Sequence, residues 1–444
     1  MSETGVADGG ELPPPTSVSL TPQARLKAIL GGSAGNLVEW YDWFAYSSFS
    51  LYFAPIFFPK GDQTAQLLQA AAIFAVGFLA RPLGAWIMGV YADRAGRRAA
   101  LSVSVAMMCA GALVIALTPG FDQIGAAAPI ILLLARILQG LSVGGEYGAS
   151  ATYMSEMAGK ARRGFWSSFQ YVTLIAGQLI ALGVLIALQR LMPAEALAEW
   201  GWRIPFFIGA LLAVVVFWIR RGLEESAAFT NAQAAGGAPR GKTMMLFLHH
   251  PRETLMILGL TAGGSLGFYA FTTYMQKFLV NTSGFTKNQA TEISAGALFC
   301  FMVAQPLVGW LSDKVGRKTM LVGAFGLGSA LTWPIMTTIA GTNSTWAAFG
   351  LMLSALLILS GYTAISAVIK AELFPVHVRA LGVALPYALA NAVFGGTAES
   401  VALSFKAAGA ESGFYLYVTA IMAVAFVVAL ILKDTARHSR IVED

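Results

Sequence analysis

Twelve long apolar runs follow one another along this chain of 444 residues. A helix needs about 20 apolar residues to cross a bilayer. Such runs cover residues 27–56, 64–91, 99–118, 128–154, 164–190, 203–220, 253–280, 289–311, 319–340, 345–371, 379–406 and 412–432. Only 12% of the residues are charged, too few to solvate a soluble fold of this length. The sequence therefore predicts an all-α membrane protein and excludes a cytosolic enzyme and a nucleic-acid binder, despite a net charge of +6.

The basic residues predict how these spans are oriented. If the N-terminus lies inside the cell, cytoplasmic segments hold 21 of the 29 lysines and arginines, outer segments hold six, and Arg81 and Arg136 lie within spans. Basic residues favour cytoplasmic loops, so we expect both termini in the cytoplasm. A signal-peptide pattern is not visible at the N-terminus. We expect a multi-pass protein of a bacterial inner membrane that works as a monomer.

Polar segments and an internal repeat predict two halves. Gly89-x-x-x-Asp93-Arg94-x-Gly96-Arg97-Arg98 returns 220 residues later as Gly309-x-x-x-Asp313-Lys314-x-Gly316-Arg317-Lys318. A second repeat, an acidic residue seven positions before an arginine, pairs Glu156 and Arg163 with Glu372 and Arg379. Transporters are often built from such repeats. We expect a disordered tail over residues 1–26 and an N-terminal six-helix bundle over 27–220. A cytoplasmic linker over 221–252 then leads to a pseudo-symmetric C-terminal six-helix bundle over 253–432 and a second tail over 433–444.

The repeated loop resembles the signature of the major facilitator superfamily. Leu132-x-x-x-Arg136-x-x-Gln139-Gly140 is similar to the second motif of that superfamily, and the stretch 35–42 resembles its metabolite:proton symporter family. Longer stretches that begin at Ser142, Trp200, Phe271 and Lys370 resemble carriers of 2-oxoglutarate in this family. The resemblance covers nearly all of residues 27–432. It implies a proton-coupled symporter that works by alternating access and needs no cofactor or metal.

Three acidic residues within spans are candidates for carrying the proton. A charge inside a span costs about 2.5–3.5 kcal/mol on insertion scales and usually serves function. Glu39 and Asp42 share one face of span 1, and Glu146 lies in a glycine-rich part of span 4. A carboxylate shielded from water can cycle between its neutral and ionised forms. The alternative is that each belongs to a fixed ion pair, with Arg81 as the partner of Glu39 and Asp42.

Arginine and lysine side chains within or near the spans are candidates for binding an anion. Arginine stays charged and fits a carboxylate with two parallel hydrogen bonds, and a dicarboxylate needs two cations. Arg81 and Arg136 lie in the first half, and Lys277 and Lys370 lie near span ends in the second, where they could instead be interfacial anchors. Neutral polar residues that could complete the site, or only join helices, are Gln170, Tyr171, Gln178, Tyr269, Tyr274, Tyr387 and Asn391.

The repeated loops predict a gate on the cytoplasmic side. Gly89 and Gly309 leave room for close helix packing, and Asp93 could bind the N-terminus of span 11, where a helix dipole favours an anion. Ion pairs are expected between Arg97 and Glu156 and between Arg317 and Glu372. The other predicted gate residues are Arg163, Asp313 and Arg379. The alternative is that the basic residues of these loops only set the topology.

The expected cargo is a small organic dianion, with 2-oxoglutarate favoured by the resemblance. Citrate, shikimate or another carboxylate is an alternative cargo for the same transporter class. A membrane nutrient sensor is an alternative of another class, but a sensor usually needs an output domain, and tails of 26 and 12 residues supply none. A membrane enzyme is disfavoured because the sequence contains no nucleophile–base arrangement and no metal-ligand spacing.

Overall fold

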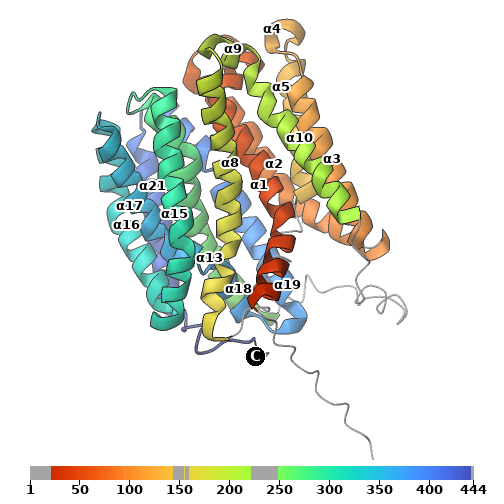
Figure 1. Cartoon of the computed structure of the whole chain (residues 1–444). Coiled ribbons are helices and arrows are strands. Elements are labelled where there is room, and N and C mark those ends of the chain that lie inside the picture. Colours follow the sequence, from red (N-terminus) through yellow and green to blue (C-terminus); the bar gives the residue numbers. More distant parts are fainter. Residues whose placement is uncertain (1–21, 96, 144–154, 156–159, 222–248, 442–444) are drawn as a thin grey trace, which may run out of the picture.

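The computed structural model describes residues 22–95, 97–143, 155, 160–221 and 249–441, and every regular element within these ranges is a helix (Figure 1). A bilayer offers no water to backbone amides, so a spanning chain must satisfy them within each helix. The first half contains α1 (Pro22–Phe57), α2 (Gln63–Ala95), α3 (Arg97–Leu117), α4 (Phe121–Ile124), α5 (Ala127–Val143), η1 (Lys160–Arg162), α7 (Arg163–Ser167), α8 (Phe169–Leu191), α9 (Ala194–Glu199), η2 (Gly201–Arg203) and α10 (Ile204–Arg221).

The second half repeats this pattern and adds two π-helical turns. It contains α13 (Pro251–Tyr269), η3 (Ala270–Tyr274), α14 (Met275–Asn281), α15 (Lys287–Val315), α16 (Arg317–Gly341), α17 (Thr345–Thr363), α18 (Ser366–Leu373), α19 (Val376–Ala390), η4 (Asn391–Gly395), α20 (Ala398–Ala407) and α21 (Ser412–Ile431). The π-helices η3 and η4 interrupt the spans that run from α13 to α14 and from α19 to α20.

The predicted twelve spans are confirmed. Nine of the described helices are long and apolar enough to cross a membrane, and the ranges 102–117 and 127–142 are shorter apolar helices. The 36-residue α1 completes the set. Large apolar side chains such as Leu134, Leu211 and Trp218 are exposed on the outer surface of the bundle, as a lipid-facing surface requires.

Small residues bring α2 close to α5 in the first half. A Cβ on Gly84 would overlap the backbone of Leu141, and one on Gly77 would lie 3.1 Å from the carbonyl oxygen of Arg136. Helices in membranes pack closely where such small residues face each other. Because Gly77 and Gly84 flank Arg81 on one face of α2, this packing sets Arg81 beside Arg136.

The two halves meet along a central interface. Figure 1 shows α16, α17 and α21 on one side of the molecule and α3, α5 and α10 on the other. Between them, α8 packs on α15, α2 packs on η4 and α20, and α7 packs on α15 and α18. We call the end that carries residues 433–441 the tail end, and the end that carries α4 and α9 the opposite end. The polar side chains described below lie along this interface.

Candidate transport site

The first ion pair of the site joins α1 to α2. Arg81 donates a hydrogen bond to Glu39, with 2.8 Å between Nη2 and Oε1, and both side chains are buried. The rings of Trp40, Trp43 and Phe78 lie 4.5 to 4.8 Å from the guanidinium carbon. Arginine binds aromatic faces as well as carboxylates, so these rings can hold Arg81 when Glu39 is not its partner. Its Nε atom has no hydrogen-bond partner within the described part of the chain.

A second ion pair lies one turn further along α1. Arg136 of α5 lies 3.7 Å from Asp42, and Gln139 bridges the two by accepting from Arg136 at 2.8 Å and donating to Asp42 at 2.7 Å. The Arg136 side chain is completely buried under Trp43 and Tyr46, at 3.9 and 4.4 Å from their ring centres. Two buried charges stabilise each other only with good geometry and further hydrogen bonds, which Gln139 provides here.

Tyr269 brings a hydroxyl group from the second half to the first ion pair. It is the last residue of α13, its ring packs edge-on against Phe78 at 5.5 Å, and it lies within electrostatic range of Arg81 and Glu39. Its ring lies beside the side chain of Asn391, the first residue of η4, because a Cβ built on Gly395 would lie within 2.8 Å of both. A π-helical turn often marks a functional site. The turn places Asn391 at the interface between the halves.

Lys370 lies in a polar group that the second half shares with Tyr171 of α8. Its ammonium donates to Ser366 at 2.7 Å and lies 4.2 Å from the ring centre of Tyr387. Tyr171 lies near Ser366 and within electrostatic range of Tyr269, Tyr362 and Tyr387. Because Tyr269 also faces Arg81, these tyrosines join the arginine of the first half to the lysine of the second.

The other residues predicted to bind substrate make their contacts elsewhere along the interface. Lys277 forms an ion pair with Glu399 at 3.2 Å, and the Tyr274 hydroxyl donates to Glu411 at 3.4 Å. Gln178 is buried in α8, two turns after Tyr171, and its Oε1 atom has no hydrogen-bond partner within the described residues. The structure thus brings Arg81, Tyr171, Tyr269, Lys370 and Asn391 into one cluster.

Sequence reasoning missed three residues of this interface. Glu399 is an acidic residue within the apolar run 379–406, so its charge was visible, but it lies close to polar residues near the end of that run. Gln139 belongs to the quoted motif of span 4, and the motif alone gives no sign that it bridges an ion pair. Ser366 carries no signal, because serine is common within membrane helices.

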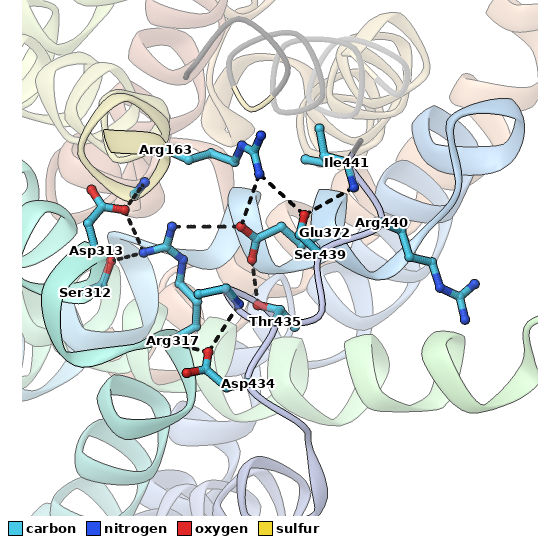
Figure 2. A network of polar contacts seen from close by, with 12 residues as sticks. Arg163, Ser312, Asp313, Arg317, Glu372, Asp434, Thr435, Ser439, Arg440 and Ile441 are labelled. Atoms are coloured by element: carbon cyan, nitrogen blue, oxygen red, sulfur yellow. Dashed lines mark hydrogen bonds and ion pairs between the residues drawn. The ribbon is translucent and has the colours of Figure 1, made fainter. Parts of the chain in front are cut away.

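At the tail end, Asp313 joins the two halves (Figure 2). Its two carboxylate oxygens accept from the backbone amides of Gly164 and Phe165 at 2.8 and 3.0 Å, and Arg317 lies 2.8 Å from it. These amides belong to the first turn of α7, where free N–H groups and the helix dipole favour an anion. The contact expected for Asp93 at span 11 is thus made by its repeat counterpart Asp313 at span 5.

Glu372 forms the second part of this tail-end network. It lies 3.9 Å from Arg163 of the first half and 3.8 Å from Arg317, the partner expected from the sequence. Thr435 of the C-terminal segment donates to Glu372 at 2.6 Å (Figure 2). Arg379 donates to the carbonyl oxygen of residue 440 at 3.1 Å. The predicted gate residues of the second half therefore also bind the segment 433–441.

Some predicted residues lie outside this description. Glu146 and Glu156 are not among the residues that the structure describes, and neither are the side-chain surroundings of Gly89, Asp93 and Arg97. The expected pairing of Arg97 with Glu156 and the expected position of Asp93 therefore stay predictions.

The chain resembles known transporters over more than nine tenths of its length. It is 55% identical over 418 residues to the alpha-ketoglutarate permease of Escherichia coli, covering 94% of this chain and 96% of that one. It is 33% identical to the citrate-proton symporter of Salmonella typhi, over 91% of this chain and 94% of the relative. The structure of the major facilitator superfamily proton:xylose symporter of Escherichia coli superposes with a TM-score of 0.74 at 18% identity, over 95% and 98% of the two chains.

The family model for sugar (and other) transporters matches the chain twice, over residues 28–237 and 238–436. One match covers the first half of the chain and the other covers the second half. The helices of the two halves together have the fold of the solved symporter. The chain therefore belongs to the sugar (and other) transporter family, is a multi-pass membrane transporter, and has the fold of a major facilitator superfamily symporter.

Proposed function

We propose that this chain is a proton-coupled symporter that carries 2-oxoglutarate into the cell by alternating access. The observation that carries this proposal is the 55% identity to the alpha-ketoglutarate permease over 94% of the chain. The geometry supports it, since cations from both halves border one buried cluster of tyrosine and asparagine side chains. A small dicarboxylate needs this combination of two cations and neutral hydrogen-bond donors.

In this mechanism Arg81 binds one carboxylate of the substrate and Lys370 binds the other. Arg81 exchanges its contact with Glu39 for the substrate, and its unpartnered Nε atom completes a two-point contact. Tyr171 and Asn391 then donate hydrogen bonds to the remaining oxygens. A group held from both halves can bind well only when the halves close around it, which couples substrate binding to the movement of the halves.

The proton neutralises Glu39 when its partner Arg81 turns to the substrate. A buried carboxylate that loses its cation is left as an uncompensated charge, which is strongly destabilising. A proton removes that charge, so binding of the anion and of the proton favour each other. Asp42, held by Arg136 and Gln139, is the second candidate for a proton in the first half.

The transporter is proposed to act in a bacterial inner membrane, as a monomer with both termini in the cytoplasm. In this orientation the tail end is the cytoplasmic end, and the network of Asp313 and Glu372 is the inner gate. That network links the halves through Gly164, Phe165 and Arg163. Each must separate from its partner in the second half when the substrate leaves toward the cytoplasm.

A second candidate cargo is citrate. The chain is 33% identical to a citrate-proton symporter over 91% of its length, so the same fold and coupling serve a larger carboxylate in a relative. Competition decides between the two cargoes. Unlabelled 2-oxoglutarate should displace labelled 2-oxoglutarate from the purified protein at lower concentrations than citrate or shikimate do.

Arg81→Ala tests the proposed binding site. Loss of a charge-assisted hydrogen bond costs about 1.5–3 kcal/mol, so we expect about 10- to 150-fold weaker binding of 2-oxoglutarate. Binding is measured by titration of the purified protein in detergent. Uptake into proteoliposomes with an inward proton gradient should fall with it.

Arg81→Lys and Arg190→Ala are the matched controls. The lysine variant keeps the charge and loses the fork, so its affinity should lie between those of wild type and Arg81→Ala. Arg190 forms an exposed ion pair with Glu292, and its loss should leave binding unchanged. Unchanged affinity in Arg81→Ala would remove this residue from the site, and uptake that ignores the proton gradient would refute symport.

A further inference from the structure

Lys277 and Glu399 form a buried ion pair that the mechanism above does not use. Their side chains are 0% and 5% exposed, and Nζ lies 3.2 Å from Oε2. Both residues belong to the second half, on α14 and α20, the helices that follow the π-helices η3 and η4. The pair lies between the central cluster and the opposite end, because α14 ends there at Asn281.

Ser47 of α1 ties this ion pair to the first half. The Lys277 ammonium donates to the Ser47 hydroxyl, which in turn donates to Glu399 at 3.4 Å. Lys277 also donates to the carbonyl oxygen of Thr273 at 3.2 Å. An ammonium has three protons to donate. Lys277 uses all three, on the Ser47 hydroxyl, the Thr273 carbonyl oxygen and the Glu399 carboxylate. The Lys277 ammonium is therefore fully hydrogen-bonded while the two halves are closed at this point.

The groups around Glu399 connect it to the rest of the site. Among the residues that the structure describes, the titratable groups that face Glu399 are Lys277 of α14, Tyr274 of η3 and Tyr46 of α1. The Tyr46 ring also lies 4.4 Å from the Arg136 guanidinium. One tyrosine thus separates the Lys277–Glu399 pair from the ion pair of Arg136.

We infer that Glu399 is a second proton-binding residue of the symporter and that Lys277 is its anion-sensing partner. The inference rests on the proposed function. When a proton neutralises Glu399, Lys277 is left without a counter-charge in a dry site, which is strongly unfavourable. The halves can then close over the pair only when the substrate, bound between Arg81 and Lys370, adds its negative charge to the same buried interface.

This arrangement prevents the two ions from crossing alone. With Glu399 ionised and no substrate, the pair is neutral and the empty carrier can close. With Glu399 neutral and no substrate, closure would bury the bare Lys277 ammonium, so the proton does not leak. With the proton and the anion both present, the local charge is balanced again. Proton and substrate therefore favour each other's binding through Lys277, as reciprocal linkage requires.

Glu399→Gln in the full-length protein tests the inference. Each coupled proton changes the apparent affinity for the anion by about tenfold per pH unit. In the variant, the slope of the logarithm of the 2-oxoglutarate affinity against pH should become smaller by one. The number of protons taken up for each substrate bound, measured with a pH dye in weak buffer, should also be smaller by one. Glu292→Gln, which breaks an exposed ion pair, should change neither quantity.

A second variant keeps the test decisive if Glu399→Gln does not fold. Lys277→Met with Glu399→Gln removes both charges, so it leaves no buried uncompensated ion. It should show the same loss of one coupled proton. A wild-type slope and proton count in either folded variant would overturn the inference. Wild-type protein that does not bind 2-oxoglutarate at any pH would instead refute the proposed function, which separates the two failures.

Discussion

At the residue scale, the site depends on charges that are each held by a partner and a set of rings. Glu39 and Asp42 lie one turn apart on α1 and meet Arg81 and Arg136 from two neighbouring helices. Trp43 lies between the two guanidinium groups and is within 4.5 Å of each. The ring separates two like charges and attracts both. Either carboxylate can therefore be neutralised while its arginine keeps part of its stabilisation.

Gly309→Ala is predicted to prevent close approach of the halves at the tail end. A Cβ at this position would lie 2.6 Å from the carbonyl oxygen of Gly164. Overpacking costs about 1–3 kcal/mol, which shifts the closed-to-open ratio by about five- to 150-fold. Spin labels at Arg162→Cys and Lys314→Cys lie on the two sides of the contact. The distance between them should be long, as in the open state, in a larger fraction of the Gly309→Ala molecules than of wild type. Uptake of substrate should fall in the same variant.

Gly350→Ala is the matched control for this prediction. The same change is made in α17, but no atom lies within 4 Å of the added Cβ. Its distance distribution and its uptake should be those of wild type. A Gly309→Ala protein with the wild-type distribution would mean that the backbone contact with Gly164 does not limit closure.

Residues that carry a charge inside a span can be found from the sequence, but their partners can be found only in part. Glu39 and Arg81 were paired by depth alone, because each residue advances a helix by about 1.5 Å. The alternative interpretation, in which Asp42 belongs to a fixed ion pair with Arg81, names the wrong partner, because the structure pairs Asp42 with Arg136 and Gln139. Depth fixes the level of a side chain in the membrane, whereas partner choice depends on how the helices are rotated.

At the element scale, two π-helical turns mark the second half of the site. Η3 follows Tyr269 directly, and η4 begins with Asn391. A π-turn adds one residue to the helix and shifts the register of everything after it. Lys277 and Glu399 both follow such a turn, and their side chains meet at 3.2 Å. The register shift is not visible in hydropathy, so these turns could not be predicted from the apolar runs.

The lengths of the spans, by contrast, were predictable because composition determines them. The run 345–371 corresponds to α17 and α18, and the run 412–432 corresponds to α21. The short helices α4 and α9 were not predicted, since four and six residues are too few for a periodic pattern. The segment 433–441 was expected to be only a tail, because its contacts depend on charges brought from distant helices.

Truncation after Leu432 is predicted to weaken the network at the tail end. It removes the hydrogen bond from Thr435 to Glu372 and the contact of Asp434 with the backbone amide of Arg317, at 3.1 Å. A single hydrogen bond to a charged group contributes about 1.5–3 kcal/mol. The measurement uses a cysteine in place of the buried Ser167, in a protein without the native cysteines. In the truncated protein, this cysteine should react with a membrane-impermeant thiol reagent added at the tail end about tenfold faster, or more, than in the full-length protein.

Truncation after Ile441 is the control, since it removes only the last three residues of the chain. Its labelling rate should equal that of the full-length protein. Equal rates in both truncations would show that the segment 433–441 does not hold the tail-end network closed.

At the scale of the whole molecule, the repeat brings equivalent residues to the centre. Tyr171 of α8 and Tyr387 of α19 are 216 residues apart, the same offset as that between Arg163 and Arg379. The two tyrosines lie within electrostatic range of each other in the cluster that contains Lys370. The symmetry of the sequence therefore predicts which positions face each other, although the chemistry of the two halves differs.

The charges along the interface set the number of protons that balance the substrate. Within the part of the chain that the structure describes, and apart from the tail-end network, the buried charged groups discussed above are four cations and three anions: Arg81, Arg136, Lys277 and Lys370, and Glu39, Asp42 and Glu399. A dianion adds two negative charges to this set. Two protons, one on Glu39 and one on Glu399 in the proposals above, restore the original balance. The occupied carrier then has the same charge as the empty one.

This balance predicts at least two protons for each dianion transported. Moving one negative charge against an inside-negative potential costs about 2.3 kcal/mol per 100 mV, so a dianion alone costs about 4.6 kcal/mol. With two protons this cost cancels, and uptake should depend on the pH gradient but not on a potassium diffusion potential. With three, an inside-negative potential should accelerate uptake. Counting labelled substrate against protons taken up by proteoliposomes measures the ratio, and a ratio of one would contradict this charge balance.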